Sequence, residues 1–209
     1  MTSSFKKDII LSIVAGEITS WFIIFVIKNP LIVEAQKFVQ LQNFAVYLPI
    51  IVPLFFIFGI IGGKLFQKIF PFLYQFAKFV EIGILNTFID LGILNFLASL
   101  TGITSGPFLI PITATSFLAA VTNSYFWNKF WTFERKIEMK KKEFLPFLII
   151  SAIGLGINTG IVFLGATYIS PFGNISPGAW LNLVKILAVL IVMFWNFFGY
   201  KFFVFKKSR

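Results

Sequence analysis

The sequence predicts an all-α protein built as a polytopic bundle of six transmembrane helices. Of its 209 residues, 58% are hydrophobic and only 12% are charged, whereas soluble domains carry about a quarter charged residues. Thirty residues are Phe, more than a small water-exposed protein can bury. Apolar runs of about 20 residues, the length that spans a bilayer as a helix, recur along the chain. The composition therefore excludes an ordinary soluble domain.

The predicted spans follow one another with short connections. They cover approximately Ile9–Ile27, Phe44–Gly63, Phe76–Leu100, Phe108–Phe130, Phe144–Ile169 and Ala179–Phe203. Several contain Gly or Pro, which membrane helices tolerate better than soluble helices do. The first run follows Lys6 and Lys7 as a secretory signal would, but Glu17 interrupts it and no small-residue cleavage site follows. We therefore expect an uncleaved first helix.

The basic residues predict which side of the membrane each connection faces. If the N-terminus is inside, 15 of the 18 Lys and Arg lie on the inner side, only Lys28 and Lys37 lie outside, and Lys185 stays within a span. By the positive-inside rule, we expect a multi-pass protein of the cell membrane with both termini in the cytoplasm. The net charge of +10 then indicates topology and attraction to anionic lipid headgroups, not nucleic-acid binding.

The sequence offers little to catalysis. Cys and His are both absent, which excludes disulfides, Cys/His metal sites, thiol nucleophiles and His-based triads. The stretch "GLGINTG" lies inside a predicted span with no strand before it, so it is not a nucleotide-binding loop. The longest hydrophilic segment, between Phe133 and Phe144, is too short for a catalytic domain. We expect no enzyme activity, no cofactor and no metal.

An aromatic and basic phrase occurs twice. "YFWNKFWTFERK" (125–136) returns 72 residues later as "FFGYKFFVFKKS" (197–208), so that Lys129 corresponds to Lys201. Aromatic rings at headgroup depth with Lys reaching outward explain the composition of the phrase as an interfacial anchor. That interpretation does not explain why the phrase recurs.

The same shift of 72 residues also aligns polar residues inside two spans. Asn86-Thr87 falls on Asn158-Thr159. Each unit is then a helical hairpin, with Asn-Thr in its first helix and the phrase closing its second. Because both units start on the same side of the membrane, the repeat is parallel. Helix packing by small and weakly polar residues is the alternative explanation of the Asn-Thr pairs.

The segment from Phe76 to Phe205 resembles the GtrA-like family of small four-helix membrane proteins. The resemblance rests on "FVEIGILNTFIDLGILNFL", "NSYFWNKFWTF" and "VKILAVLIVMFWNFFGYKFFVF". It divides the chain into an N-terminal two-helix membrane segment (1–75), a GtrA-like four-helix domain (76–205) and a basic cytoplasmic tail (206–209). Family members typically have Asn-Arg where this chain has Asn128-Lys129 and Tyr200-Lys201.

The resemblance implies a role in cell-surface polysaccharide synthesis. Members of the family are thought to move polyprenyl-phosphate-linked sugars across the membrane, or to support the glycosyltransferases that use them. We therefore expect a flippase or flippase component, with membrane lipids and a polyprenyl-phosphate sugar as its partners. A rival interpretation is a non-transporting subunit that anchors or activates a partner glycosyltransferase through the loop "ERKIEMKKKE". A third is a small proton-coupled exporter, and the small chain leaves room for a homo-oligomer.

Charged residues within the predicted spans are candidates for function, since each costs about 3 kcal/mol or more at a helix centre. Glu81 lies one turn from Lys78, and we expect the two to form an interfacial pair. For Glu17, a functional carboxylate and a protonated helix contact both remain open. Asp90 and Lys185 are predicted to lie in the same outer half of the membrane, where a buried ion pair would stabilise both. Snorkelling of Lys185 to the outer surface is the alternative.

Two groups of residues are predicted to bind substrate. At the cytoplasmic side, a basic collar would attract the lipid phosphate; deeper in the membrane, a polar seam would offer hydrogen bonds to the sugar. The collar consists of Lys129 and Lys201, and the seam of Asn86, Asn158 and Asp90 with Lys185 near the exit.

Overall fold

The computed structural model describes residues 3–32, 39–70, 73–132 and 141–199 of the chain. Within these ranges the elements are α1 (Ser3–Ile27), α3 (Val39–Phe44), the 3₁₀ turn η1 (Ala45–Tyr47), α4 (Leu48–Phe66), α5 (Leu73–Thr101), α6 (Leu109–Trp127), the π-helical turn η2 (Asn128–Thr132), α7 (Lys141–Tyr168) and α8 (Pro177–Gly199). Six helices of the described residues are long and apolar enough to span a membrane. The predicted all-α fold with six spans is confirmed, although residues 200–203 of the last predicted span lie outside the described residues.

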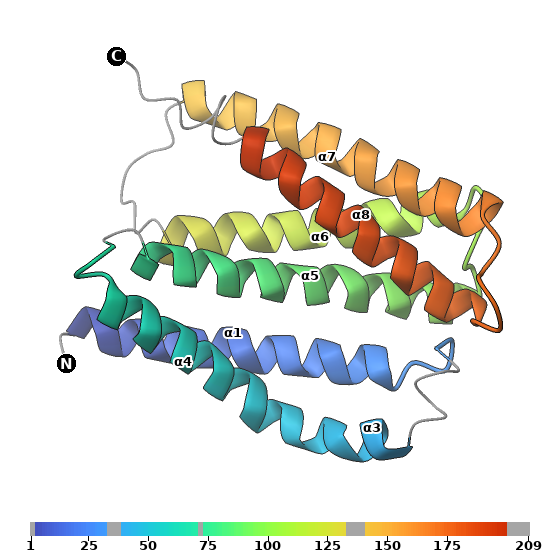
Figure 1. Ribbon diagram of the computed structural model, residues 1–209. Coiled ribbons are helices and arrows are strands. Elements are labelled where there is room, and N and C mark those ends of the chain that lie inside the picture. Colours follow the sequence, from blue (N-terminus) through green and yellow to red (C-terminus); the bar gives the residue numbers. More distant parts are fainter. Residues whose placement is uncertain (1–2, 33–38, 71–72, 133–140, 200–209) are drawn as a thin grey trace.

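The six long helices form three antiparallel hairpins stacked on one another (Figure 1). The pair α1/α4 lies on one side of α5/α6, and the pair α7/α8 lies on the other. Helix α5 is central, because it packs against α1, α4, α6 and α8. The beginning of α1 and the end of α8 lie at the same end of the molecule. We call this the near end and the opposite one the far end.

The last four helices have the directions that a parallel repeat requires. Helices α5 and α7 both begin at the near end, whereas α6 and α8 both begin at the far end (Figure 1). The two hairpins therefore cross the bundle in the same sense, as the shift of 72 residues predicted. That the near end faces the cytoplasm remains a prediction from the distribution of Lys and Arg.

Glycines allow the N-terminal hairpin to pack closely. A Cβ atom at Gly16 of α1 would lie only 2.6 Å from the Cα atom of Pro53 in α4. A Cβ atom at Gly92 of α5 would overlap the ring of Phe22 from α1. Small residues at such crossings let helix backbones approach each other, which is how membrane helices gain packing energy. Helix α1 is thereby packed tightly against both α4 and α5.

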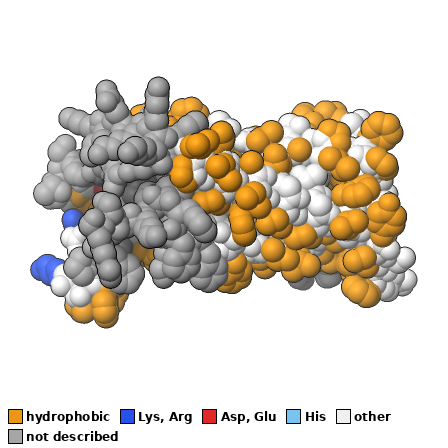
Figure 2. All heavy atoms as spheres, turned by 90° about the horizontal axis from the view of Figure 1, so that it is seen from above, with side chains coloured by type: hydrophobic (Ala, Val, Ile, Leu, Met, Phe, Trp, Pro, Cys, Tyr) orange, Lys and Arg blue, Asp and Glu red, His pale blue; other side chains and the backbone are white. Residues whose placement is uncertain are grey.

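The surface is apolar, and most exposed charges of the described residues lie at one end. Figure 2 shows hydrophobic side chains over much of the described surface, with the visible Lys and Arg at the near end. Large side chains such as Phe58 and Phe108, 69% and 73% exposed, point outward. Since soluble proteins rarely expose such continuous apolar surface, this exterior suits contact with lipid.

Candidate functional site

Two charges meet inside the bundle. The Nζ atom of Lys185, on α8, lies 2.8 Å from Oδ1 of Asp90, on α5. Lys185 is 0% exposed and Asp90 only 3% exposed. The predicted buried pair is therefore confirmed, and the alternative that Lys185 snorkels to the surface is wrong. Lys185 lies eight residues after the start of α8, about 12 Å along the helix axis, so its ammonium group stays in the interior.

Lys185 also binds the other two helices of this four-helix unit. Its ammonium group donates to Oδ1 of Asn158 on α7 at 2.7 Å and to Oγ of Ser116 on α6 at 3.3 Å. Together with the ion pair to Asp90 on α5, these two hydrogen bonds surround the ammonium group with polar partners. One side chain thus joins α5, α6, α7 and α8. We call Asp90, Ser116, Asn158 and Lys185 the Lys185 network.

Two neutral polar groups on fully buried residues of α6 and α7 have no hydrogen-bond partner among the described residues. They are the Nδ2 atom of Asn158 and the hydroxyl group of Thr113, and both residues are fully buried. Thr113 is the counterpart of Lys185 under the shift of 72 residues. A buried donor without a partner costs about 1–3 kcal/mol. The two groups therefore offer hydrogen bonds to a molecule that enters the network.

Asn86, which was predicted to share a seam with Asp90 and Asn158, has a different partner. Its Oδ1 atom accepts from Nδ2 of Asn123 on α6 at 2.7 Å, and Oδ1 of Asn123 accepts from the indole of Trp127 at 3.1 Å. The hydroxyl of Thr87 donates to the carbonyl of Gly83 in its own helix. The structure thus brings together Asp90, Asn158 and Lys185, while Asn86 belongs to a separate contact between α5 and α6.

A buried amide pair lies toward the far end from the Lys185 network. Asn95 and Asn182 exchange two hydrogen bonds, of 2.6 and 2.9 Å, between α5 and α8. Asn29, just after α1, donates to the backbone carbonyl of Asn95 at 3.0 Å. This pair was not predicted from the sequence. One signal pointed to it, because Asn182 lies three residues before Lys185 and therefore on the same helix face.

A second charged cluster lies at the near end. Nζ of Lys78 on α5 lies 2.9 Å from Oδ2 of Asp8 on α1, and both residues are buried. The hydroxyl of Tyr74 and the indole of Trp131 also donate to Asp8. The sequence analysis missed Asp8, because a carboxylate beside Lys6 and Lys7 reads as part of a solvated N-terminus. Asp8 is instead the acceptor that joins α1 to α5 and η2.

Lys78 forms its close ion pair with Asp8 and not with Glu81, although its charge still attracts the Glu81 carboxyl group. Lys78 pairs with Asp8, and Glu81 accepts a hydrogen bond from Ser12 of α1 at 2.8 Å. The reason is geometric, since α1 crosses α5 here and supplies a carboxylate that spacing along one helix cannot reveal. Glu17 is half-buried in α1, and the described residues include no partner for its side chain.

The first repeat phrase is only partly an interfacial anchor. Phe126 and Phe130 stack with their ring centroids 6.3 Å apart and are exposed, as an anchor requires. Trp131 is only 1% exposed and binds Asp8. Lys129 belongs to the π-helical turn η2, and such turns interrupt helices frequently at functional sites. Lys201 lies outside the described residues.

The fold and these contacts define a multi-pass α-helical membrane protein with a buried ionic network in its last four helices. Residues 78–205 match the family described as GtrA/DPMS, transmembrane domain. The chain belongs to this family, and α1 and α4 precede the matched region. Searches of curated proteins and of solved structures found no match.

Proposed function

We propose that this protein translocates polyprenyl-phosphate-linked sugars across the membrane, or assists their translocation, for the synthesis of cell-surface polysaccharide. The observation that carries the proposal is the fully buried Lys185, which lies on α8 and contacts α5, α6 and α7. A cation in the membrane interior is costly. It is suited to a substrate whose anionic phosphate must leave water.

The ion pair allows a phosphate to bind by exchange. In the empty protein Asp90 neutralises Lys185, which keeps the cation stable in a low dielectric. A phosphate that reaches the network replaces Asp90 as the anion beside Nζ. Lys185 then remains paired throughout. The exchange shifts the flexible Lys side chain, whose ammonium group is also held by the neutral acceptors Asn158 and Ser116. Binding of the phosphate must offset the cost of leaving Asp90 buried without its cation.

The neutral groups support recognition of the headgroup. The free Nδ2 donor of Asn158 and the hydroxyl of Thr113 lie buried and without partners in the described structure. They offer hydrogen bonds to phosphate or sugar oxygens, while the prenyl chain stays in lipid beside the apolar exterior. The proposal involves no covalent chemistry. The predicted collar residues Lys129 and Lys201 would gather the anionic headgroup from the cytoplasmic leaflet.

Transfer between leaflets in liposomes tests the proposal. The purified protein is reconstituted with a fluorescent glycosyl phosphoprenol, and a membrane-impermeant quencher reports the fraction exposed outside. We expect the wild-type protein to accelerate transfer and Lys185→Met to abolish it. Lys28→Gln is the matched control, because Lys28 is an exposed lysine just after α1 and takes part in none of the network's contacts.

The same assay distinguishes translocation by this chain from a role as a non-transporting subunit of a glycosyltransferase. Transfer in liposomes without any other protein supports translocation by this chain. Transfer that appears only when a partner glycosyltransferase is added supports the non-transporting subunit. A correctly folded wild-type protein that never changes the transfer rate, alone or with the enzyme, contradicts the proposal.

A further inference from the structure

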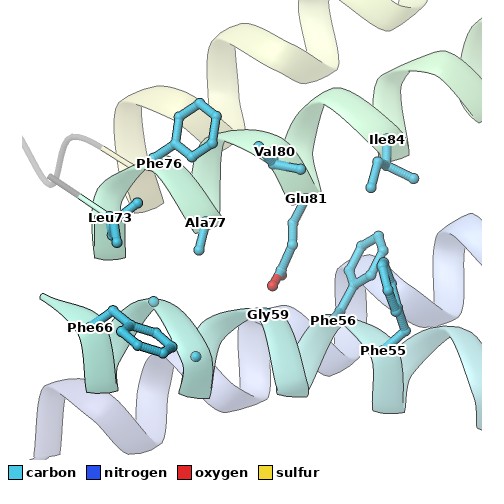
Figure 3. A pocket seen from close by; sticks show the side chains of 12 residues that line it. Phe55, Phe56, Gly59, Phe66, Leu73, Phe76, Ala77, Val80, Glu81 and Ile84 are labelled. Carbon is cyan, nitrogen blue, oxygen red and sulfur yellow. The ribbon is translucent and has the colours of Figure 1, made fainter. Parts of the chain in front are cut away.

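A groove between α4 and α5 holds a carboxylate that is separate from the Lys185 network. The cavity has a volume of about 310 Å³ and opens at the apolar surface of the bundle. Glu81 extends from α5 between the two helices, with Phe66 and Phe76 on one side of it and Phe55 and Phe56 on the other (Figure 3). Helix α4 precedes the region that matches the family.

The carboxyl group of Glu81 is buried, and only one of its two oxygens has a hydrogen-bond partner among the described residues. Glu81 is 4% exposed, and its Oε2 atom accepts from Ser12 at 2.8 Å. Its Oε1 atom has no hydrogen-bond partner among the described residues. Gly59 of α4 makes room for this atom, because a Cβ there would lie 3.3 Å from Oε1. The unpartnered oxygen therefore faces the groove.

The neighbouring cation is already neutralised. Lys78, one turn before Glu81, is paired with Asp8 at 2.9 Å and lies 4.8 Å from the centroid of the Tyr74 ring. Glu81 is thus a second acidic side chain beside one ammonium group that is already paired with Asp8. A positive charge from outside the described chain would pair with Glu81.

We propose that the α4–α5 groove binds a lipophilic monocation, that is, an apolar molecule carrying one positive charge. A carboxylate and aromatic rings both attract a cation, and the attraction is strong where water is excluded. A phosphate would be repelled by Glu81. A sugar headgroup would find one acceptor for its several hydroxyls, leaving most of them unsatisfied. The volume lies within the range of small-molecule sites, which begins at about 300 Å³.

Binding of tetraphenylphosphonium tests this assignment. The radiolabelled cation is titrated against the full-length protein in nanodiscs of zwitterionic phosphatidylcholine, so that anionic lipids do not adsorb it. We expect saturable binding, weakened about tenfold or more by Glu81→Gln. Tetraphenylborate, an anion of the same shape, should not bind saturably when it is measured separately.

Two pairs of variants control for folding. Gly62→Phe fills the groove, whereas Gly83→Phe adds the same side chain to α5 outside it; a Cβ at either glycine meets no atom within 4 Å. Glu17→Gln removes a half-buried carboxylate elsewhere. We expect Gly62→Phe to lose binding, and Gly83→Phe and Glu17→Gln to retain it. Equal binding of cation and anion, or wild-type affinity in both Glu81→Gln and Gly62→Phe, would show that the groove holds only lipid tails and would overturn the proposal.

Discussion

Asp90 and Lys185 are 95 positions apart in the chain, and their charged atoms lie 2.8 Å apart within the bundle. The pair closes the contact between α5 and α8, which pack less extensively than the helices within each hairpin. Asn158 and Ser116 extend the same contact to α7 and α6. A contact this central is expected to matter both to folding and to the proposed transport.

A double-mutant cycle measures the interaction free energy between Asp90 and Lys185. Removing either partner leaves a buried charge uncompensated, which typically costs 3–5 kcal/mol. Asp90→Asn and Lys185→Met should each lower the unfolding free energy in detergent by about this amount. The double variant should be much more stable than the sum of the two losses predicts, and should still fail to transport if Lys185 meets the phosphate. Strictly additive losses would show that the two charges do not interact.

The ion pair at the near end should be necessary for docking α1. Asp8→Asn leaves Lys78 buried without its counter-ion and weakens the hydrogen bonds of Tyr74 and Trp131. We expect a loss of about 3–5 kcal/mol in the unfolding free energy. Glu17→Gln in the same helix is the control, and its thermal unfolding should match that of the wild type. An Asp8→Asn variant as stable as this control would mean that the N-terminal helix is held by apolar packing alone.

The close crossing of α1 and α5 predicts a contrast between two glycines. Gly92→Val places a side chain where the ring of Phe22 lies, and overpacking of this kind typically costs 1–3 kcal/mol. Gly83→Val on the same helix meets no atom within 4 Å. Melting temperatures in detergent should fall for Gly92→Val and stay near the wild-type value for Gly83→Val. Equal melting temperatures for the two variants would show that the ring of Phe22 does not pack against Gly92.

The topology can be tested by labelling introduced cysteines, since the natural chain has none. Ser105 and Asn174 lie exposed in the far-end connections, and Lys68 lies exposed after α4. The positive-inside rule predicts that the far end is outside. An impermeant thiol reagent added to intact cells should therefore label cysteines at Ser105 and Asn174 and spare one at Lys68. The reverse labelling pattern would show that the protein has the opposite orientation in the membrane.

The basic collar predicts a loss of lipid binding without a loss of insertion. Replacing both Lys129 and Lys201 with Gln removes two positive charges near the headgroups, each worth about 1 kcal/mol in attraction to an anionic surface. The double variant should reach the membrane in normal amounts and bind a polyprenyl phosphate about tenfold or more weakly. Unchanged affinity would leave the repeated phrase as an interfacial anchor only.

The sequence by itself determined the number of spans, the hairpin repeat, the family and the two charges that belong together in the interior. Apolar length reports a span directly. An isolated Asp and an isolated Lys at similar depth can be matched because each is too costly to leave alone. The pairing of Asp90 with Lys185 was therefore predictable without knowing how the helices pack.

Only the tertiary structure decided which neighbouring helix supplies each remaining partner. Spacing along α5 suggested that Lys78 meets Glu81, yet α1 crosses there and provides Asp8 and Ser12 instead. The contact between Asn95 and Asn182 likewise depends on which helices pack together. So does the position of Glu81 beside Gly59. Membrane helices are apolar on all sides, so their sequences carry no stripe that marks the face toward a neighbour. Backbone approach at small residues selects that face, and it does so only when the helices are packed together.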